Sequence, residues 1–442
     1  MNLFSLSWAY LRKRALNSAL NILLMAFGIG TITVLLLLSD QIEENLYKNA
    51  EGIDVVVGAK GSPIQLILSG MYHMDAPTGN ISLDQAVELM QSRFVRTAYP
   101  LSLGDNWQGY RIVGTNYAYL ELFGAEVAEG HLWDHEFEVV VGANVAEQLG
   151  IAIGDRVISA HGLSEGGMAH PDHKMIVSGI LNPSGSVLDQ LVLTSVETMW
   201  GIHSYGPTPA VNGWNAVTAK PEEKAEHATE IDHAHSEDSE SGHSHGVLVT
   251  DNSWMNEKYR DKEITVLLVE YANPLAAAQF PRYVNTQTDM QAAAPAYEIS
   301  RLMSILGVGL EAIQVFGYIL IFSSALGLFI ALLNSMKDRA YDLAVMRSLG
   351  GSKAKLVSMV LSEGLWISAW GGITGIILAH IVLEGIGFWF AQARQFAISG
   401  AIFLPAEFSI LGLAISIGLL ASFFPAIVAY RTEISKILST SG

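Results

Sequence analysis

The fold of this chain is decided by the stretch Met336–Glu363, which reads MKDRAYDLAVMRSLGGSKAKLVSMVLSE and separates two long uncharged segments. Its lysines and arginines outnumber its acidic residues, so the positive-inside rule places it on the cytoplasmic side of a membrane. A helical pattern runs from Asp338 to Leu349 and stops at Gly350-Gly351, and Ser352 can cap a following helix. The sequence therefore predicts a short basic helix that lies outside the bilayer and joins two membrane helices.

Two interpretations fit such a helix. A rigid connection suits a lever that passes force into both membrane helices, whereas a flexible tether would be enough to join them. The competing interpretation is an ordinary cytoplasmic loop whose basic residues only set the topology. The residue pattern alone leaves both interpretations open.

The run from Arg339 to Ser352, RAYDLAVMRSLGGS, with Glu363 downstream, resembles the coupling segment of the FtsX-like permease family. That family supplies the membrane subunits of MacB-type (type VII) ABC transporters. Asp342 stands where the family commonly has Glu, and Gly351 stands where it commonly has Ala. The resemblance implies that the following residues couple the chain to an ATPase: Arg339, Asp342, Leu343, Met346, Arg347, Leu349, Gly350 and Glu363.

The composition is that of a membrane protein. Of the 442 residues, 50% are hydrophobic, and the mean hydropathy is +0.32, which is too apolar for an ordinary soluble enzyme. The net charge of −18 argues against a nucleic-acid partner, which would require a basic surface. The chain has no cysteine, which excludes disulfides, thiolate metal sites and cysteine nucleophiles.

Four uncharged segments are long enough to cross about 30 Å of hydrocarbon. The first is residues 15–39, the second part of the N-terminal segment 1–39. The other three are residues 312–336, 364–383 and 408–430. We expect the first ten residues to form an amphipathic helix at the membrane surface. A cleaved signal peptide is the competing interpretation of this segment, but the apolar run is too long and no small-x-small pattern follows it.

The charge pattern also predicts the sidedness. Residues 40–311 and the short loop 384–407 are expected outside, whereas the coupling segment 337–363 and the tail 431–442 are expected in the cytoplasm. Together with the resemblance to the FtsX-like permeases, this sidedness implies a multi-pass protein of the bacterial inner membrane with both termini in the cytoplasm.

The long segment 40–311 has the short β-like runs and the glycine and proline punctuation of a folded domain. The predicted fold class is an α-helical membrane protein with four transmembrane helices and a large mixed α+β periplasmic domain inserted between the first and second. The expected strands are 52–58, 138–142, 156–159, 174–180, 190–193 and 263–269, and the expected helices are 82–93 and 143–149. Residues 138–158 resemble the periplasmic core of MacB-type permeases, in which a Leu-Gly-x-x-x-Gly-Asp turn recurs.

Motifs for catalysis are missing from the sequence. There is no Gly-x4-Gly-Lys-[Ser/Thr] phosphate loop, no Gly-x-Ser-x-Gly and no His-Glu-x-x-His. His131 and His135 have the spacing of a helical metal pair, but Gly130 and the β-like run after them argue against a helix. We therefore predict that the chain is not an enzyme, and the family resemblance implies that ATP and Mg²⁺ bind to a separate ATPase subunit.

The segment 222–246 is rich in Glu, Asp, His and Ser and contains two His-x-His pairs. In an extended chain, residues i and i+2 point the same way, so each pair can offer two imidazoles to one ion. The candidate zinc ligands are His233, His235, His243 and His245. The alternative is a solvated insertion in which the histidines are incidental or act as pH-sensitive charges.

The membrane segments offer few polar groups to a solute. His380 is the ionisable residue within them, and we expect it to be hydrogen-bonded to a neighbouring helix. Gly371, Gly372 and Gly375 permit close helix packing, which we assign to a subunit interface. Spans without a polar lining favour the transmission of movement over a hydrophilic conduit.

The resemblance implies a permease that transmits ATPase-driven movement across the membrane, as a homodimer or a pair with a related permease, bound to two copies of a cytoplasmic ABC ATPase. A periplasmic partner protein is a further expectation. Two alternatives stay open: a zinc-linked uptake or export permease that uses the His-rich tract, and an FtsX-like regulator of a periplasmic enzyme that moves no solute.

Overall fold

The computed structural model describes residues 12, 15–162, 169–203, 247–338, 347–348, 350–392 and 398–431. Two compact units emerge from its contacts. One unit consists of Met1–Glu51 with Ala296–Gly442, and we call its helices the membrane bundle. The other, Gly52–Pro295, is called the inserted domain. The expected surface helix 1–10 and most of the tail 431–442 lie outside the described residues.

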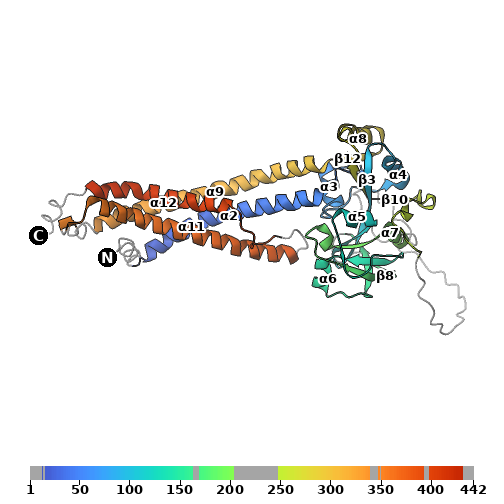
Figure 1. The fold of residues 1–442 in the computed structure, drawn as a ribbon, viewed down its shortest axis with the longest axis horizontal. Coiled ribbons are helices and arrows are strands. Elements are labelled where there is room, and N and C mark those ends of the chain that lie inside the picture. Colours follow the sequence, from blue (N-terminus) through green and yellow to red (C-terminus); the bar gives the residue numbers. More distant parts are fainter. Residues whose placement is uncertain are drawn as a thin grey trace, which may run out of the picture. The chain divides into compact units, whose positions relative to one another are not determined.

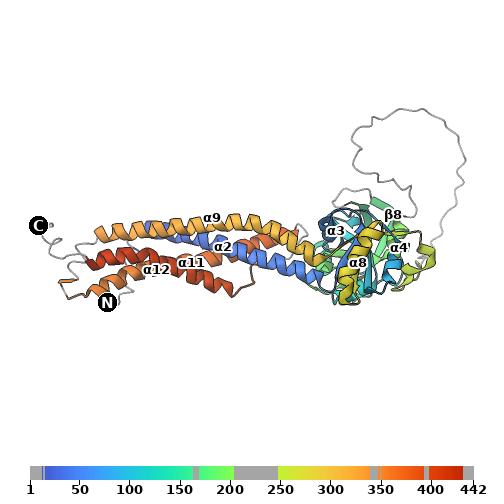
Figure 2. The ribbon, with the colours of Figure 1, turned by 90° about the horizontal axis from the view of Figure 1, so that it is seen from above.

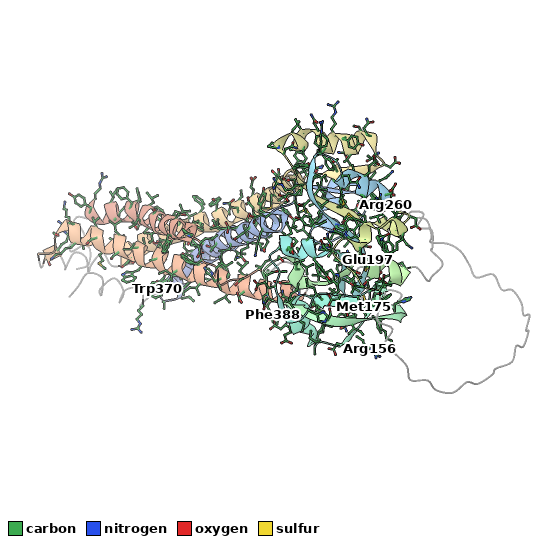
Figure 3. The ribbon with its side chains drawn as sticks, turned by 45° about the vertical axis from the view of Figure 1, so that its right-hand side comes forward. Arg156, Met175, Glu197, Arg260, Trp370 and Phe388 are labelled. Atoms are coloured by element: carbon green, nitrogen blue, oxygen red, sulfur yellow. The ribbon has the colours of Figure 1, made fainter. Side chains whose placement is uncertain are left out.

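The membrane bundle contains the four helices that the hydropathy pattern predicts (Figures 1 and 2). They are α2 (Ala15–Ala50), α9 (Pro295–Asp338), α11 (Lys353–Gln392) and α12 (Ala406–Arg431). Each has an apolar stretch long enough to cross a membrane. Many of their large apolar side chains are exposed, including Trp370 (41%) and Phe388 (70%), which are labelled in Figure 3. Such exposure on a long apolar helix is expected of a surface that faces lipid.

Three of the helices continue well beyond the uncharged segments. Helix α2 ends at Ala50, and α9 already begins at Pro295, so it has 44 residues. A helix of that length extends about 66 Å, roughly twice the thickness of the hydrocarbon core. The fall in hydropathy at residues 40 and 311 therefore marks where each helix passes from hydrocarbon to a polar environment, and the helix itself continues.

The glycines of the third span pack against helices of the same chain. A Cβ atom on Gly375 would lie 2.7 Å from the carbonyl oxygen of Ala26 on α2, and one on Gly371 would lie 2.7 Å from Cβ of Met25. Gly372 faces α12, where Cδ1 of Leu411 would be 2.8 Å away. The assignment of these glycines to a subunit interface is therefore corrected, because their missing side chains leave room for α2 and α12.

A second close contact joins α11 and α12. Gly364 and Ser368 on α11 meet Gly418 and Ser422 on α12, and a Cβ atom on Gly418 would lie 2.3 Å from that of Ser368. Small residues spaced by four on both helices allow the backbones to approach closely. The bundle interior is thus tightly packed around these pairs.

The inserted domain is built on one large sheet, ordered β12-β1-β11-β3-β4-β9-β6-β8-β5, with β7 paired to both β3 and β8. Because β7 returns to β3, the strands β3, β4, β9, β6, β8 and β7 form a closed ring. A separate short pair joins β2 to β10. The strands are β1 (Val55–Ala59), β2 (Ile81–Ser82), β3 (Val95–Trp107), β4 (Tyr110–Thr115), β5 (Val127–Gly130), β6 (Glu138–Val141), β7 (Arg156–His161), β8 (Ala169–Leu181), β9 (Leu191–Ser195), β10 (Glu263–Ile264), β11 (Val266–Tyr271) and β12 (Met290–Ala293).

Two hydrophobic cores stabilise this domain. One lies between the β1–β11–β12 part of the sheet and its covering helices, with Phe280 and Trp254 fully buried. The other combines buried residues of the ring strands, among them Ile112, Val139 and Met175, with Val145 and Met199 from two helices. The helices of the domain are α3 (Pro63–Gly70), α4 (Leu83–Met90), α5 (Tyr117–Leu122), α6 (Ala143–Leu149), α7 (Val196–His203) and α8 (Pro274–Gln287).

The predicted fold class is confirmed: a mixed α/β domain stands between the first and second of four apolar helices. Helix α6 has the predicted bounds, and the Gly154-Asp155 turn forms with Gly154 at φ +91°. The expected run 263–269 is divided between β10 and β11.

Candidate functional site

The coupling segment is described at its ends. Arg347 is half-buried, and Gly350 has φ +94°, a left-handed conformation that ends a helix and favours glycine. The backbone N–H of Lys355 donates to Oγ of Ser352 over 3.3 Å, so the predicted cap of α11 is confirmed. The remaining predicted coupling residues lie outside the described residues: Arg339, Asp342, Leu343, Met346 and Leu349.

Glu363 lies on α11 and is only 4% exposed. The same part of the bundle contains an apolar cluster in which Leu332 of α9 and Ala426 of α12 pack beside Val360. A carboxylate in such surroundings is costly unless other groups engage it. Its burial makes Glu363 a structural part of the bundle and not a group on its surface.

A polar cluster, which we call the loop cluster, joins the helices at the loop between α11 and α12. His380 Nδ1 lies 2.6 Å from the carbonyl oxygen of Gly400, and its Nε2 lies 2.9 Å from Oε2 of Glu407. The side-chain amide of Gln41 on α2 and the backbone of Ser399 exchange two hydrogen bonds of 3.0 and 2.9 Å. The expectation that His380 is hydrogen-bonded to a neighbouring helix is confirmed, since Glu407 belongs to α12.

The His380–Glu407 pair must hold a proton between its two groups. A carbonyl oxygen only accepts hydrogen bonds, so His380 Nδ1 carries a hydrogen and donates to Gly400. The contact from Nε2 to Glu407 then needs one more proton, on the imidazole or on the carboxyl group. Because Glu407 is fully buried, removal of His380 would leave a buried carboxyl group without this partner.

In the inserted domain, a buried histidine is surrounded by an arginine and a tyrosine. Nε2 of His73 lies 3.2 Å from the hydroxyl of Tyr119, and the Arg111 guanidinium donates to the carbonyl oxygens of His73 and Asp75. Burial, together with the positive charge of Arg111, lowers the pKa of His73 to about 3. His73 is therefore neutral in the folded domain between about pH 3 and pH 6.5, a range in which an exposed histidine is protonated.

This pKa predicts acid sensitivity. Since the folded pKa is depressed, the unfolded chain binds a proton at His73 below about pH 6.5 that the folded domain does not bind, and stability falls as the pH drops from there toward 3. His73 has φ +55°, which asparagine tolerates. In isolated Gly52–Pro295, His73→Asn is expected to flatten the slope of unfolding free energy against pH between 6 and 4, by up to about 1.4 kcal/mol per pH unit.

Urea titrations at several pH values measure that slope. His131→Asn is the matched control, because the side chain of His131 is 60% exposed and the change removes a histidine while the buried group around His73 stays intact. An unchanged slope in His73→Asn would refute the assignment.

Of the histidines singled out from the sequence as metal ligands, only His131 and His135 are described, and they do not form a metal site with each other. His131 and His135 lie on no helix, and they face Asp134 and Glu138 at 3.5 and 3.7 Å. The tract histidines His233, His235, His243 and His245 lie outside the described residues. The structure instead brings together Asp105, His161 and His203, which are far apart in the sequence and which no spacing pattern could associate.

The bundle and the inserted domain define the class: a four-helix membrane protein with an α/β domain inserted after its first helix. The model of the MacB-like periplasmic core domain matches residues 18–234, and that of the FtsX-like permease C-terminal domain matches residues 314–434. The chain belongs to the FtsX-like permeases with a MacB-like periplasmic domain. It is an inner-membrane subunit of the ABC-transporter type, and such permeases work with a cytoplasmic ATPase.

Two solved structures resemble part of the chain. The periplasmic region of MacB from Actinobacillus actinomycetemcomitans aligns with a TM-score of 0.32 and 10% identity, covering 58% of this chain and 97% of its own. The extracellular domain of the noncanonic ABC-type transporter YknZ from Gram-positive bacteria aligns with a TM-score of 0.27 and 10% identity, covering 54% of this chain and 98% of its own.

Proposed function

We propose that this permease transmits the movement of a separate ATPase through the membrane to its inserted domain. The observation that carries the proposal is the continuity of the helices. Helix α2 ends at Ala50, just before the inserted domain, and α9 begins at Pro295, where that domain ends. A shift of either helix at the far end is passed along an unbroken rod, because every backbone group within it is hydrogen-bonded to the next turn.

The coupling segment 337–363 is the part that the ATPase moves. It directly joins α9 to α11, so a force on it reaches two membrane helices at once. In this proposal the helix 338–349 docks in a groove of the ATPase on the cytoplasmic side, and Arg339 and Arg347 make charge-assisted contacts. Glu363, buried among the helices, holds the lever to α11. ATP-driven closure of two ATPase copies then favours one arrangement of a permease pair over the other.

The bundle supports transmission in preference to conduction. Its described interior is filled by apolar clusters and by glycine and serine contacts between backbones. The polar groups of the loop cluster are hydrogen-bonded to one another. Such packing transmits displacement, whereas a hydrophilic conduit requires a polar lining.

Purification of the tagged full-length chain from its native membrane in mild detergent tests the proposal. We expect an ABC ATPase to co-purify and ATP hydrolysis to accompany the complex. The matched control replaces residues 338–349 by a Gly/Ser linker of equal length, which should release the ATPase while the chain still inserts in the membrane. Equal recovery of the ATPase with the linker variant, or no ATPase with the natural chain, would contradict the proposal.

The two alternatives make different predictions for reconstituted vesicles. A zinc-linked permease would move Zn²⁺ in an ATP-dependent manner and would lose this activity when the tract 222–246 is removed. A regulator of a periplasmic enzyme would hydrolyse ATP with its partner and activate that enzyme without moving a solute.

A further inference from the structure

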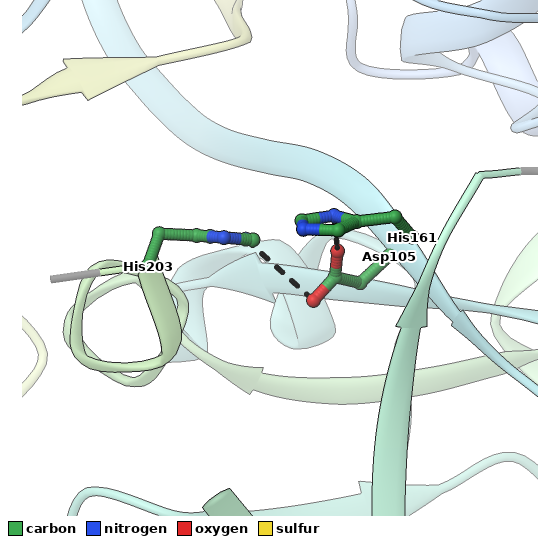
Figure 4. A group of neighbouring side chains, drawn as sticks. All are labelled: Asp105, His161 and His203. Atoms are coloured by element: carbon green, nitrogen blue, oxygen red, sulfur yellow. Dashed lines mark ion pairs between the residues drawn. The ribbon is translucent and has the colours of Figure 1, made fainter. Parts of the chain in front are cut away.

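We propose that Asp105, His161 and His203 bind a divalent transition-metal ion, with Zn²⁺ the best match. Figure 4 shows the three side chains converging from different elements of the inserted domain. Asp105 comes from β3, His161 is the last residue of β7, and His203 is the last residue of α7. Their potential ligand atoms all lie within 4.8 Å of one another.

The distances fit a single ion. Nδ1 of His161 is 3.0 Å from Oδ1 of Asp105, and Nε2 of His203 is 3.5 Å from Oδ2. Two ligand atoms on a tetrahedral zinc ion, each bonded at 2.0–2.2 Å, are about 3.4 Å apart. The two imidazole rings stack with their centroids 5.1 Å apart and their planes 16° from parallel. In this stacked arrangement the nitrogen lone pairs of the two rings lie in nearly parallel planes, so the side chains must rotate for both nitrogens to bind one ion.

Asp105 is the strongest reason to expect a cation here. Its side chain has no exposed surface, and within the described structure neither of its carboxylate oxygens has a hydrogen-bond partner. The nitrogens of the two histidines are near, but they do not have hydrogen-bond alignment with it. A buried carboxylate is strongly destabilising unless it is paired or coordinates a metal. His161 and His203 form ion pairs with Asp105 only when their imidazoles are protonated, whereas a divalent ion would supply the opposite charge with both imidazoles neutral.

The backbone around Asp105 holds the ligands in place. Asp105 is directly opposite His161 in the antiparallel pair of β3 and β7, which closes the ring of strands. The side-chain amide of Asn106 donates to the carbonyl oxygens of Ala160 and Gly162, and the N–H of Gly162 donates to Gly104. Gly104, at φ +145°, lies where the register between β3 and β4 shifts, a bulge that re-aims the following side chain.

The ligand set selects the class of metal. Two imidazoles and one carboxylate suit Zn²⁺, Cu²⁺ or Ni²⁺ far better than Mg²⁺ or Ca²⁺, which prefer oxygen ligands. The side chains of His161 and His203 are 47% and 40% exposed, so an ion can reach the site from solvent. Three protein ligands leave a fourth position for water or for a group of another molecule. The site is thus suited to exchange or sensing of a metal ion at the surface of the domain.

The test uses the full-length chain in detergent, stripped of metal by a chelator, with the tract histidines 227, 233, 235, 243 and 245 changed to serine. We expect this parent chain to bind one Zn²⁺ in competition with a fluorescent zinc chelator. Its Co²⁺ form should show the visible absorption bands of a tetrahedral site. Asp105→Asn and His161→Gln should each weaken Zn²⁺ binding by more than about tenfold. His131→Gln, at an exposed histidine of the same domain, should bind as the parent does.

Folding is followed separately by thermal unfolding. Zn²⁺ should raise the unfolding temperature of the parent chain and of His131→Gln but not that of Asp105→Asn. Asp105→Asn removes a buried charge without a change of shape, so we expect its metal-free form to be at least as stable as the parent. A parent chain without Zn²⁺ binding, or an Asp105→Asn variant that binds as tightly as the parent, would overturn the proposal. No ATPase is present in these measurements, so their outcome is independent of the coupling function.

Discussion

Met346→Asp and Leu349→Asp are expected to abolish stimulation of the partner ATPase while the membrane protein itself stays folded. Both residues belong to the predicted docking helix 338–349. An apolar side chain in a docking groove loses its burial when it becomes charged, and an unpaired carboxylate in the groove adds a desolvation cost of several kcal/mol. At 1.4 kcal/mol per tenfold change in affinity, about 4 kcal/mol would weaken docking roughly a thousandfold.

The measurement is ATP hydrolysis in reconstituted vesicles with and without the permease. Ala354→Asp is the matched control, because Ala354 is exposed in the first turn of α11 and a carboxylate is favourable there. The control should stimulate hydrolysis as the natural chain does. Full stimulation by Met346→Asp or Leu349→Asp would show that this helix is not the docking element.

His380→Leu is expected to destabilise the membrane bundle by about 3–5 kcal/mol. The change removes the partner of Glu407, whose side chain is fully buried, and leaves the carbonyl oxygen of Gly400 without its donor. Thermal unfolding of the purified protein in detergent measures the effect. Glu44→Leu removes a carboxylate from an exposed position of α2 and should change stability far less.

A double variant separates the contribution of the His380–Glu407 contact from that of the surrounding packing. In His380→Leu/Glu407→Leu both partners of the contact are apolar, so no buried charge remains uncompensated. We expect the double variant to be more stable than His380→Leu alone. If the losses of unfolding free energy in the two single variants simply add in the double variant, the contact between His380 and Glu407 does not carry the stability of this region.

Local patterns in the sequence predict the parts of the fold that depend on near neighbours. The membrane helices follow from uncharged length, α6 from the residues between two glycines, and the start of α11 from Ser352. The ends of α2 and α9 could not be predicted from hydropathy. A helix can continue into water, and hydropathy reports only where charged residues begin.

The closed ring of strands depends on pairings that no local pattern contains. Strand β3 is 13 residues long, and a glycine bulge breaks its alternation of buried and exposed residues, so the sequence does not identify it as a strand. The group formed by Asp105, His161 and His203 exists only because β7 pairs with β3 and α7 ends beside them. A histidine-rich tract is easy to recognise in a sequence, whereas three isolated ligands become visible only in the fold.

The coupling segment is the centre of this account, and its accessibility tests the account most directly. The natural chain has no cysteine, so Ser348→Cys introduces a single thiol at an exposed position of the segment. We predict that a membrane-impermeant maleimide labels this thiol in inside-out vesicles and not in right-side-out vesicles, and that the bound ATPase blocks the labelling. Lys60→Cys in the inserted domain should show the opposite sidedness. Labelling of Ser348→Cys from the outside, or equal labelling with and without the ATPase, would contradict the account.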